Sequence, residues 1–402
     1  MSEKYLSLNC GSSSLKFSLY LMPEETVIAK GYIEKIGQDD SFWTITYNDN
    51  KITGAKKLDN HSEAVTVMLD ELKNNEIITD LNEIKGVGHR VLHGGELYND
   101  SVIIDQKVLD DIVKLTNLGP LHHPGEIAGI KAMQTVLPAV SQVAVFDTAF
   151  HQTMPRESYI YAVPYEWYTK YKVRRYGFHG TSHKYITNKM QTILGKEDVN
   201  LIICHVGSGA SITCIKDGQS YDTSMGLTPL DGLVMGTRSG AIDPSIIKFM
   251  TSESNMNLDE VMDELNKNSG LKGICGKNDF RDMMALIKAD DEQAKLAYEI
   301  FMDSIIKHIA EYYFELEGNI DALVFTAGIL ENNTQIREDI VNKLSGAMAI
   351  YIEMDSNDSI GYGHNKKMGI ITTEESKFPV YVLPTDEEVV IVRDTYRLTK
   401  EA

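Results

Sequence analysis

One local pattern, a strand followed by a turn rich in glycine and serine and then a second strand, occurs twice in this chain. The first copy spans residues 4–21 with its turn at Cys10–Ser14, and the second spans residues 200–215 with its turn at Val206–Ala210. Two halves that each open with such a hairpin predict a duplicated α/β fold with a cleft between the copies. Hairpin turns of small residues are common, so the repeat alone leaves chance similarity open.

The other expected elements come from hydrophobic periodicity. A period of 3.6 residues predicts helices, whereas short apolar or alternating runs predict strands. The expected helices are 61–79, 106–117, 181–194, 244–252, 292–317 and 334–345, and the expected strands are 84–91, 143–146, 321–330 and 380–383. A chain of 402 residues has room for two or three domains of this kind.

The charge balance excludes some classes of partner. The chain has 39 Lys and Arg against 58 Asp and Glu, a net charge of −19, which argues against nucleic acid or an anionic membrane as the main partner. A small anion held in one pocket stays possible. No apolar run approaches the roughly 18 residues of a membrane span, and no secretory signal is visible at the start.

The cysteines indicate a compartment rather than a site. Cys10, Cys204, Cys214 and Cys275 form no CxxC pair and no zinc spacing, and the first three lie in apolar, strand-like surroundings. We therefore expect free thiols in a reducing cytoplasm.

Anion-binding features gather around glycine. The two Gly/Ser turns offer backbone N–H groups and hydroxyls that can cradle phosphate oxygens, and Lys16 adds a positive charge near the first turn. Arg90 and Arg238 are each framed by glycines, which suits presentation of a guanidinium to phosphate or carboxylate, with a surface ion pair as the alternative for each. Neither GxxxxGK[ST] nor GxGxxG after a strand is present.

Histidines and acidic residues are further candidates. His179 and His183 have the i,i+4 spacing of a zinc helix but lack its glutamate, so a hydrogen-bonding or transition-state role is favoured over metal ligation. His122 and His123 precede Pro124 and are interpreted as structural. Asp147 follows a short strand, a position that suits binding of Mg²⁺ or positioning of a water, and its alternative role is to cap a helix. Residues 385–388 also follow a strand and could hold a metal or cap a helix.

Seven sequence blocks taken together closely resemble the acetokinase family, the acetate kinases. They appear in that family's order and the resemblance runs from residue 5 to the C-terminus: Asn9–Lys16, Gly88–Gly95, Phe146–His151, Tyr176–His183, Asp222–Gly226, Met235–Gly240 and Asn278–Arg281. The family belongs to the acetate and sugar kinase, Hsp70 and actin superfamily. The resemblance therefore implies two related ribonuclease-H-like, actin-like ATPase domains, one of residues 1–150 with 387–402 and a nucleotide-binding one of residues 151–386.

The activity implied by the resemblance is reversible phosphoryl transfer from ATP to acetate, giving acetyl phosphate and ADP by direct in-line transfer. It implies Mg²⁺, with Mn²⁺ as a possible substitute, and a cytoplasmic homodimer. The loose transition state spreads charge over the phosphoryl oxygens, which suits arginine, imidazole and metal donors. The acceptor carboxylate is ionised at neutral pH and needs no general base, so we expect Asp147 to position Mg²⁺ or its waters.

The resemblance also assigns roles to individual residues. Catalytic roles fall to Asp147, His179 and Arg238, metal ligation to Asn9 and Glu387, and the acceptor carboxylate to Arg90. The acceptor's methyl pocket would be lined by Leu92, Leu121, Phe178 and Pro229. The phosphate and nucleotide residues would be Ser12, Ser14, Lys16, His205, Val206, Gly207, Ser208, Gly209, Asp279, Phe280, Arg281, Gly328, Ile329, Leu330, Glu331 and Asn332.

Three positions depart from the family's usual pattern. Ser208 stands where asparagine is usual, Leu330 where glycine is usual, and Asp386 where asparagine is usual. We expect Leu330 to narrow the nucleoside pocket or loosen base selectivity. The alternatives to an acetate kinase are a propionate or butyrate kinase on the same scaffold, a non-catalytic nucleotide switch, and a histidine metallohydrolase. The size of Leu92 favours the shorter acid, although one methylene is worth only about 1–3 kcal/mol.

Overall fold

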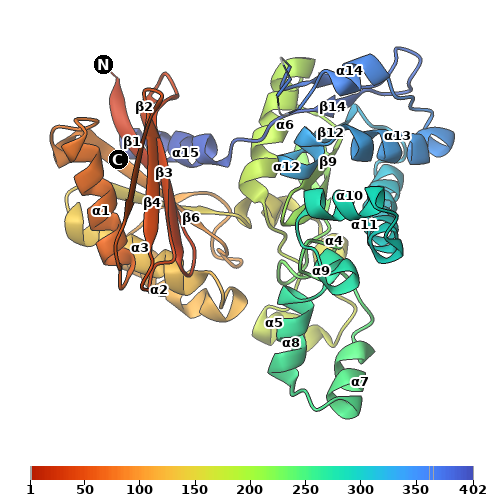
Figure 1. Cartoon of the computed structure of the whole chain (residues 1–402), viewed down its shortest axis with the longest axis horizontal. Helices are drawn as coiled ribbons and strands as arrows, with labels where there is room; N and C mark the ends of the chain where they lie inside the picture. The colour runs from red at the N-terminus through yellow and green to blue at the C-terminus, as the bar shows by residue number, and fades with distance from the viewer. Residues whose placement is uncertain (1, 362, 365, 402) are drawn as a thin grey trace. The chain divides into compact units, whose positions relative to one another are not determined.

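A computed structural model describes residues 2–361, 363–364 and 366–401. The chain forms two compact units, one of residues 1–150 with 386–402 and one of residues 151–385 (Figure 1).

The first unit is built on an eight-stranded mixed sheet in the order β5-β4-β3-β2-β1-β6-β8-β7. Its strands are β1 (Glu3–Cys10), β2 (Ser14–Met22), β3 (Thr26–Glu34), β4 (Phe42–Tyr47), β5 (Asn50–Ala55), β6 (Ile84–Val91), β7 (Val102–Ile103) and β8 (Ser141–Phe146). Strands β1 to β5 form an antiparallel meander, while β6 pairs parallel to both β1 and β8. Its main helices are α1 (His61–Asn74), α2 (Gln106–Lys114), α3 (His123–Val136) and α15 (Glu387–Glu401).

Helices cover both faces of this sheet. Side chains of β6 alternate between the faces. Val87 belongs to the core shared with α1 and α3, whereas Gly86 and Gly88 lie against α15. A Cβ at Gly88 would lie 2.3 Å from the Thr395 hydroxyl, so glycine lets α15 approach the strand closely.

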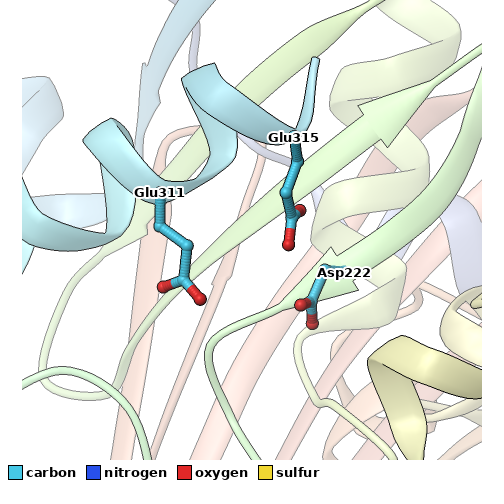
Figure 2. Close-up of side chains that lie close together, drawn as sticks. All are labelled: Asp222, Glu311 and Glu315. Atoms are coloured by element: carbon cyan, nitrogen blue, oxygen red, sulfur yellow. The ribbon is translucent and has the colours of Figure 1, made fainter. Parts of the chain in front are cut away.

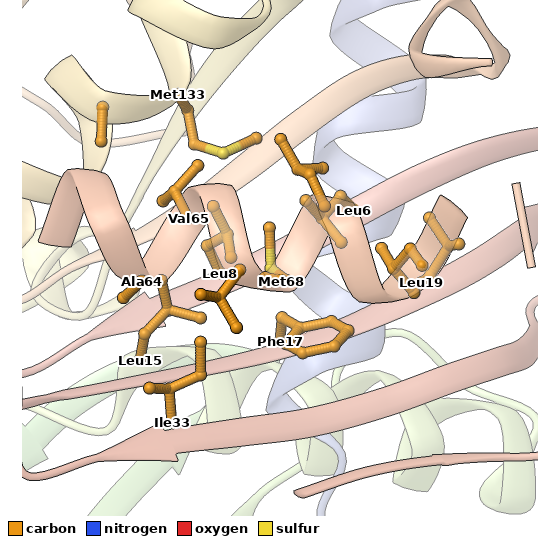
Figure 3. Packing of buried hydrophobic residues seen from close by; sticks show 14 of the residues in the cluster. Leu6, Leu8, Leu15, Phe17, Leu19, Ile33, Ala64, Val65, Met68 and Met133 are labelled. Atoms are coloured by element: carbon orange, nitrogen blue, oxygen red, sulfur yellow. The ribbon is translucent and has the colours of Figure 1, made fainter. Parts of the chain in front are cut away.

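The core on the α1 face is a continuous apolar layer (Figure 3). Apolar side chains of β1, β2 and β3 meet those of α1 and α3 there: Leu6, Leu8, Leu15, Phe17, Leu19, Ile33, Ala64, Val65, Met68 and Met133. Full burial of such a side chain contributes about 1.5–3 kcal/mol, so this layer holds α1 and α3 against β1 and β2, the two strands that flank the first Gly/Ser turn.

Helix α1 is shorter than the expected 61–79. Asn60 caps its start by accepting from the Glu63 N–H at 3.1 Å. The helix ends at Asn74 because Glu76 adopts a φ of 56°, and the N–H groups of Ile77 and Ile78 then bond back to the Leu72 carbonyl. The expected helix 106–117 is likewise divided into α2 and a 3₁₀ turn at Leu115–Leu118.

The second unit is built on a six-stranded sheet in the order β11-β10-β9-β12-β14-β13. Its strands are β9 (Leu201–Val206), β10 (Ala210–Lys216), β11 (Gln219–Thr223), β12 (Ala322–Thr326), β13 (Gly369–Ile370) and β14 (Val380–Val382). Its helices are α4 (Arg156–Tyr159), α5 (Tyr165–Tyr171), α6 (Gly180–Leu194), α7 (Ser245–Glu253), α8 (Leu258–Lys267), α9 (Gly270–Cys275), α10 (Phe280–Lys288), α11 (Glu292–Glu315), α12 (Ala327–Asn332), α13 (Thr334–Met348) and α14 (Met354–Asp358).

The expected strand over 321–330 is strand only as far as Thr326. Ala327 has a φ of 67°, which turns the chain into α12, and the N–H of Ala327 donates to the Glu331 carboxylate at 2.7 Å. The apolar run therefore contains a buried strand followed by a helix, two elements that an unbroken apolar pattern does not distinguish.

The two sheets share one strand arrangement. In the first unit the order β3-β2-β1-β6-β8 combines an antiparallel hairpin extension with two parallel strands, and β11-β10-β9-β12-β14 does the same in the second. The repeated hairpins at residues 4–21 and 200–215 thus occupy equivalent places, which confirms the predicted duplicated α/β fold.

Two further observations concern the chain as a whole. Cys10, Cys204, Cys214 and Cys275 are free, the first three buried, as expected. Within the described ranges, no helix combines the length and the apolar character that crossing a membrane requires.

Candidate active site

The first Gly/Ser turn is held against α3. The Gly11 N–H donates to the Ser14 carbonyl at 2.9 Å, which closes the turn between β1 and β2. Gly125 of α3 packs directly on it, and a Cβ there would lie 2.3 Å from the Gly11 carbonyl oxygen. Ser12 and Lys16 remain exposed, so a hydroxyl and an ammonium are available to an anion beside this turn.

Arg90 and Asp147, predicted to act on different groups, form an ion pair in the first unit. Arg90 Nε lies 3.0 Å from Asp147 Oδ1, and Nη2 lies 2.6 Å from Oδ2, a bidentate arrangement. Asp147 is completely buried, while the Arg90 side chain is 24% exposed. Burial acts to lower the pKa of Arg90, but the charges of Asp147 and Glu387 outweigh it and raise that pKa, so the guanidinium stays protonated.

Burial also raises the pKa of Asp147 above its usual value, and Arg90 opposes that rise. The Asp147 N–H donates to the Val91 carbonyl at 2.9 Å, which ties the end of β8 to the end of β6. The alternative prediction, that Asp147 caps a helix, is not borne out, because both carboxylate oxygens of Asp147 accept from Arg90.

Asn9 and Glu387 lie at the ends of neighbouring elements. Asn9 is near the carboxyl end of β1, and Glu387 is the first residue of α15, which packs on β1 and β6. Glu387 Oε2 is 3.9 Å from Arg90 Nε. Asp386 caps α15, its carboxylate accepting from the Val389 N–H at 3.0 Å, which is the capping interpretation expected for residues 385–388.

The apolar residues expected around the acceptor divide between the two units. Leu92 is 5% exposed and lies beside Gly119, whereas Leu121 is 53% exposed on the turn before α3. Phe178 is 1% exposed, and its carbonyl accepts from His151 Nε2 at 3.0 Å. Pro229 belongs to the loop that carries Arg238.

A network of imidazoles and hydroxyls supports the second Gly/Ser turn. His179 Nδ1 and His183 Nε2 both contact the Ser211 hydroxyl, at 2.9 and 2.8 Å. The ring of His205 stacks on that of His179 with centroids 4.2 Å apart, and Ser182 Oγ lies 2.8 Å from His205 Nδ1. Burial lowers the pKa of His183 well below its usual value, so its ring is neutral. Both histidines thus contact one serine hydroxyl, and their predicted role toward a bound phosphoryl group stays a prediction.

Arg238 points to the same turn without an acidic partner. A Cβ at Gly209 would lie 3.2 Å from His179 Nε2 and 3.6 Å from Arg238 Nη1, so both donors flank this glycine. Arg238 Nη1 donates to the Pro229 carbonyl at 3.2 Å. Burial lowers the pKa of Arg238, and no carboxylate pairs with it among the residues that the structure describes. A partly desolvated guanidinium of this kind suits a bound anion.

The predicted nucleotide segments meet at the ends of β9 and β12. These strands pair in parallel, with Thr326 opposite His205. A Cβ at Gly207 would lie 3.8 Å from the Gly328 nitrogen, so the Val206–Ala210 turn and the start of α12 are adjacent. Glu331 folds back on this junction, where its carboxylate accepts from the N–H groups of Ala327 and Thr385 at 2.7 and 3.2 Å.

Asp279 and Arg281 pair with each other at the start of α10. Arg281 Nε lies 3.0 Å from Asp279 Oδ1 and Nη2 lies 2.7 Å from Oδ2, while the Arg281 side chain is 88% exposed. Phe280 is buried against Tyr298 and Phe301. A Cβ at Gly236 would lie 2.8 Å from the Asn278 carbonyl oxygen, which joins this segment to the loop of Arg238.

Leu330 is placed in the interior. Its side chain is completely buried, and its carbonyl accepts from Arg337 at 2.9 Å. Arg337 is itself completely buried and donates to Asn357, Glu331 and Ile360 as well. A buried Leu330 side chain offers no surface to a nucleoside, so its effect on donor choice would have to act through packing.

Three acidic side chains of the second unit lie close together between α11 and β11 (Figure 2). Glu311 and Glu315, one helical turn apart on α11, and Asp222 of β11 have carboxylate oxygens within 4.8 Å of one another. Arg175 Nη1 is 3.2 Å from Asp222 Oδ1 and offsets part of this charge. Burial raises the pKa of Glu315 to about 8 and also raises that of Asp222, and a proton on Glu315 further reduces the repulsion.

Glu126 was not among the predicted site residues. It lies on the buried face of α3, 5% exposed, and its Oε1 accepts from the Leu92 N–H at 3.1 Å. The available signal was its position four and seven residues before the buried Ile130 and Met133, since an acid on an apolar helical stripe requires a partner.

Comparisons with known proteins identify the family of this chain. The acetokinase family profile matches residues 4–393 of the chain. The acetate kinase of Bacillus subtilis strain 168 is 47% identical over 401 residues, which cover 99% of this chain and 100% of that protein. The chain belongs to the acetokinase family.

Solved structures show the same fold along the whole chain. The acetate kinase of Porphyromonas gingivalis matches with a TM-score of 0.92 and 40% identity over 98% of this chain and 99% of that one. A propionate kinase from Francisella tularensis subsp. tularensis SCHU S4 also matches with a TM-score of 0.92, at 41% identity over 98% of this chain and 100% of that one. The two related actin-like units expected from the resemblance are therefore confirmed.

Proposed function

We propose that this chain is an acetate kinase that transfers a phosphoryl group reversibly from ATP to acetate, giving acetyl phosphate and ADP. Membership of the acetokinase family makes it a phosphotransferase that acts on a carboxyl group, rather than a nucleotide switch or a metallohydrolase. The observation that carries the proposal is Arg238, a partly desolvated cation without a carboxylate partner in the described part of the chain, beside His179 at the Gly209 turn.

The acceptor side belongs to the first unit in this proposal. Arg90 binds the carboxylate of acetate, and the bidentate contact with Asp147 holds the guanidinium in one orientation. Of the residues predicted to contact the methyl group, Leu92 and Leu121 belong to this unit. The acceptor is already ionised at neutral pH, so no group needs to remove a proton from it.

The donor side belongs to the second unit. His179 and Arg238 donate to the equatorial oxygens of the phosphoryl group, where negative charge spreads in the loose transition state. The Val206–Ala210 turn and the segments 279–281 and 328–332 hold the nucleotide. Because the histidines are fixed by the hydroxyls of Ser211 and Ser182, little reorganisation is required when charge develops.

The proposed metal ligands fit Mg²⁺. The side chains of Asn9 and Glu387 offer oxygen donors from adjacent elements, and Mg²⁺ in phosphoryl-transfer enzymes is usually bound through one or two carboxylates with substrate phosphates and waters. When bound, the ion would neutralise negative charge on the phosphate groups of the nucleotide. Asp147 lies in the same cluster through Arg90 and Glu387, consistent with a role in placing the metal's waters. Mn²⁺ is an expected substitute.

The decisive experiment traps acetyl phosphate as its hydroxamate. Purified protein with ATP and Mg²⁺ is offered acetate, propionate and butyrate, and kcat/KM is compared. We expect acetate to be preferred, with propionate used more weakly. The similarity to a propionate kinase supplies the second candidate, which a preference for propionate would establish. No hydroxamate from any acid would refute the proposal.

We further propose that the enzyme is a cytoplasmic homodimer. The observation in support is membership of the acetokinase family, for which the sequence resemblance implies this assembly. Light scattering coupled to size exclusion should give twice the 45.0 kDa chain mass. A single-chain mass at working concentrations would refute the dimer.

A further inference from the structure

The first turn of α3 touches two parts of the acceptor side at once. Gly125 packs on Gly11 and Ser12 of the first Gly/Ser turn, and the next residue, Glu126, holds the backbone of Leu92. Leu92 follows Arg90 by two residues, in the segment where β6 ends. A change in the Glu126 side chain would therefore be transmitted directly to the residues proposed to bind the acetate carboxylate and methyl group.

The segment after β6 is anchored by backbone groups on either side of Leu92. The Val91 carbonyl accepts from the Asp147 N–H at 2.9 Å, and the Gly94 N–H donates to Thr148 Oγ1 at 3.0 Å. Between these two anchors, the Leu92 N–H donates to Glu126 Oε1 at 3.1 Å. Without that acceptor the N–H of Leu92 would be buried and unpaired, and the peptide would rotate to find another partner.

The second oxygen of Glu126 faces a histidine rather than solvent. Oε2 is buried without a hydrogen-bond partner and lies 3.9 Å from His123 Nε2, which is also buried without one. His123 Nδ1 lies 3.1 Å from the Ile112 carbonyl oxygen, which can only accept, so Nδ1 carries the proton. At 3.9 Å, Oε2 and Nε2 are too far apart for a hydrogen bond, so no donor on His123 favours the ionised form of Glu126.

Charge balance also favours a protonated Glu126. Burial raises the pKa of Glu126 to about 8, the charge of Asp147 adds to the rise, and Arg90 opposes it. The groups that face Glu126 are Arg90 on β6, Asp147 after β8, Cys10 on β1 and His123 on its own helix. Two carboxylates, those of Asp147 and Glu387, already lie near Arg90. A neutral Glu126 adds no third negative charge, so the potential around Arg90 stays more positive and favours a carboxylate substrate.

We propose that Glu126 is a positioning residue that fixes the Leu92 peptide and thereby sets the affinity and size selectivity of the enzyme for its carboxylate acceptor. The inference rests on the proposed function, because it concerns the acceptor side of that reaction. Glu126 does not touch the reacting atoms in this assignment. It acts through Leu92, so its effects should appear in the acceptor constants and not in those of ATP.

The test compares two variants of Glu126 with a matched core variant of the same helix. Glu126→Gln keeps an uncharged side chain with a carbonyl acceptor, whereas Glu126→Leu keeps the volume and removes the acceptor. Met133→Ala, two turns further along α3 at a fully buried position, reports general loosening of the helix. The KM values for acetate, propionate and ATP are measured for each by hydroxamate trapping.

We expect Glu126→Leu to raise the KM for acetate about tenfold and to narrow the preference for acetate over propionate, with the KM for ATP within about twofold of wild type. Glu126→Gln should stay within about threefold for every constant. An unchanged acetate KM in Glu126→Leu, or an equal rise in Met133→Ala, would overturn the inference. If the wild-type enzyme forms no hydroxamate, the proposed function fails instead.

A pH comparison tests the proposal even if Glu126→Leu does not fold. The wild-type KM for acetate should rise above the Glu126 pKa of about 8, as an additional negative charge forms beside Arg90, and it should stay flat in Glu126→Gln. Parallel profiles for the two proteins between pH 6 and about 9 would refute the positioning role.

Discussion

Replacing Asp147 with asparagine tests how Arg90, the arginine proposed to bind the acceptor, is held. The substitution keeps the size of the side chain but removes its charge and turns one of its two acceptor oxygens into an NH₂ donor. In the structure these oxygens accept from Arg90 Nε at 3.0 Å and from Nη2 at 2.6 Å. One of the two contacts would therefore become a clash between donors, and the nearest remaining carboxylate, Glu387, is 3.9 Å away.

The expected magnitude follows from the burial of the pair. Removing one partner of a buried ion pair costs about 3–5 kcal/mol of stability. Arg90 is 24% exposed and retains Glu387, so we expect the lower end, about 3 kcal/mol. Loss of a fixed donor orientation in a phosphoryl-transfer site should lower kcat about 100-fold. The KM for acetate should not rise more than about twofold, because the released guanidinium still binds a carboxylate.

The assay is acetyl phosphate formation by hydroxamate trapping, together with urea unfolding. Asp111→Asn is the matched control: Asp111 also accepts from two cationic side chains, Lys107 and Lys114, but those lysines are exposed and away from Arg90. This control should keep its kcat.

Two results would refute the reasoning. If Asp147→Asn keeps wild-type kcat and stability, the pair does not orient Arg90. If it instead loses the acid limb of the pH–rate profile while its Mg²⁺ dependence stays normal, Asp147 acts as a general base.

Three further predictions concern single residues. The pKa of Glu126 in the folded protein, about 8, lies above its ordinary value of 4.5, so between these pH values the folded protein holds a proton that the unfolded chain releases. The free energy of unfolding should therefore fall by about 4–5 kcal/mol as the pH rises from 4.5 to 8. Urea unfolding of Glu126→Gln should lack this decline. Arg238→Ala should lower kcat/KM about 100- to 1000-fold with little change in Tm, since no described carboxylate loses its partner, and a large fall in Tm would argue for a structural role. Leu330→Gly should cost about 3–5 kcal/mol, because the side chain is fully buried, and leave the preference among ATP, GTP and pyrophosphate unchanged; a changed preference would restore the expected nucleoside contact.

The sequence predicted what depends on local pattern and on repetition. The two Gly/Ser hairpins indicated equivalent halves because each turn requires small residues, and both sheets have the same strand order. Long, strongly periodic helices such as α11 and α13 were also predictable. The end of α1 was not predictable, because it depends on a left-handed backbone conformation at Glu76. Such a conformation is usual for glycine or asparagine, and a glutamate gives no sign of it in the sequence.

Side-chain partnerships were the least predictable part of the candidate site. Arg90 and Asp147 are 57 residues apart, and their pairing depends on the parallel register of β6 and β8, which brings the two strand ends together. Glu126 was not predicted because its interaction with the N–H of Leu92 joins residues 34 positions apart, which only the folded chain brings together. Leu330 is buried because the chain turns at Ala327 from strand β12 into helix α12, whereas the sequence predicted that the strand continues through residue 330.

The position of α15 in the first unit has a consequence for how the chain is made. Its residues Val389, Val390, Ile391 and Val392 are buried, and the helix packs on β1, β6 and β8, yet it leaves the ribosome only after all of residues 151–385. During synthesis, the face of the first sheet that α15 covers must remain exposed while the second unit is already complete. The unit that is begun first is therefore finished last, and ribosomes stalled within the second unit should carry a first unit that chaperones and proteases still recognise as unfinished.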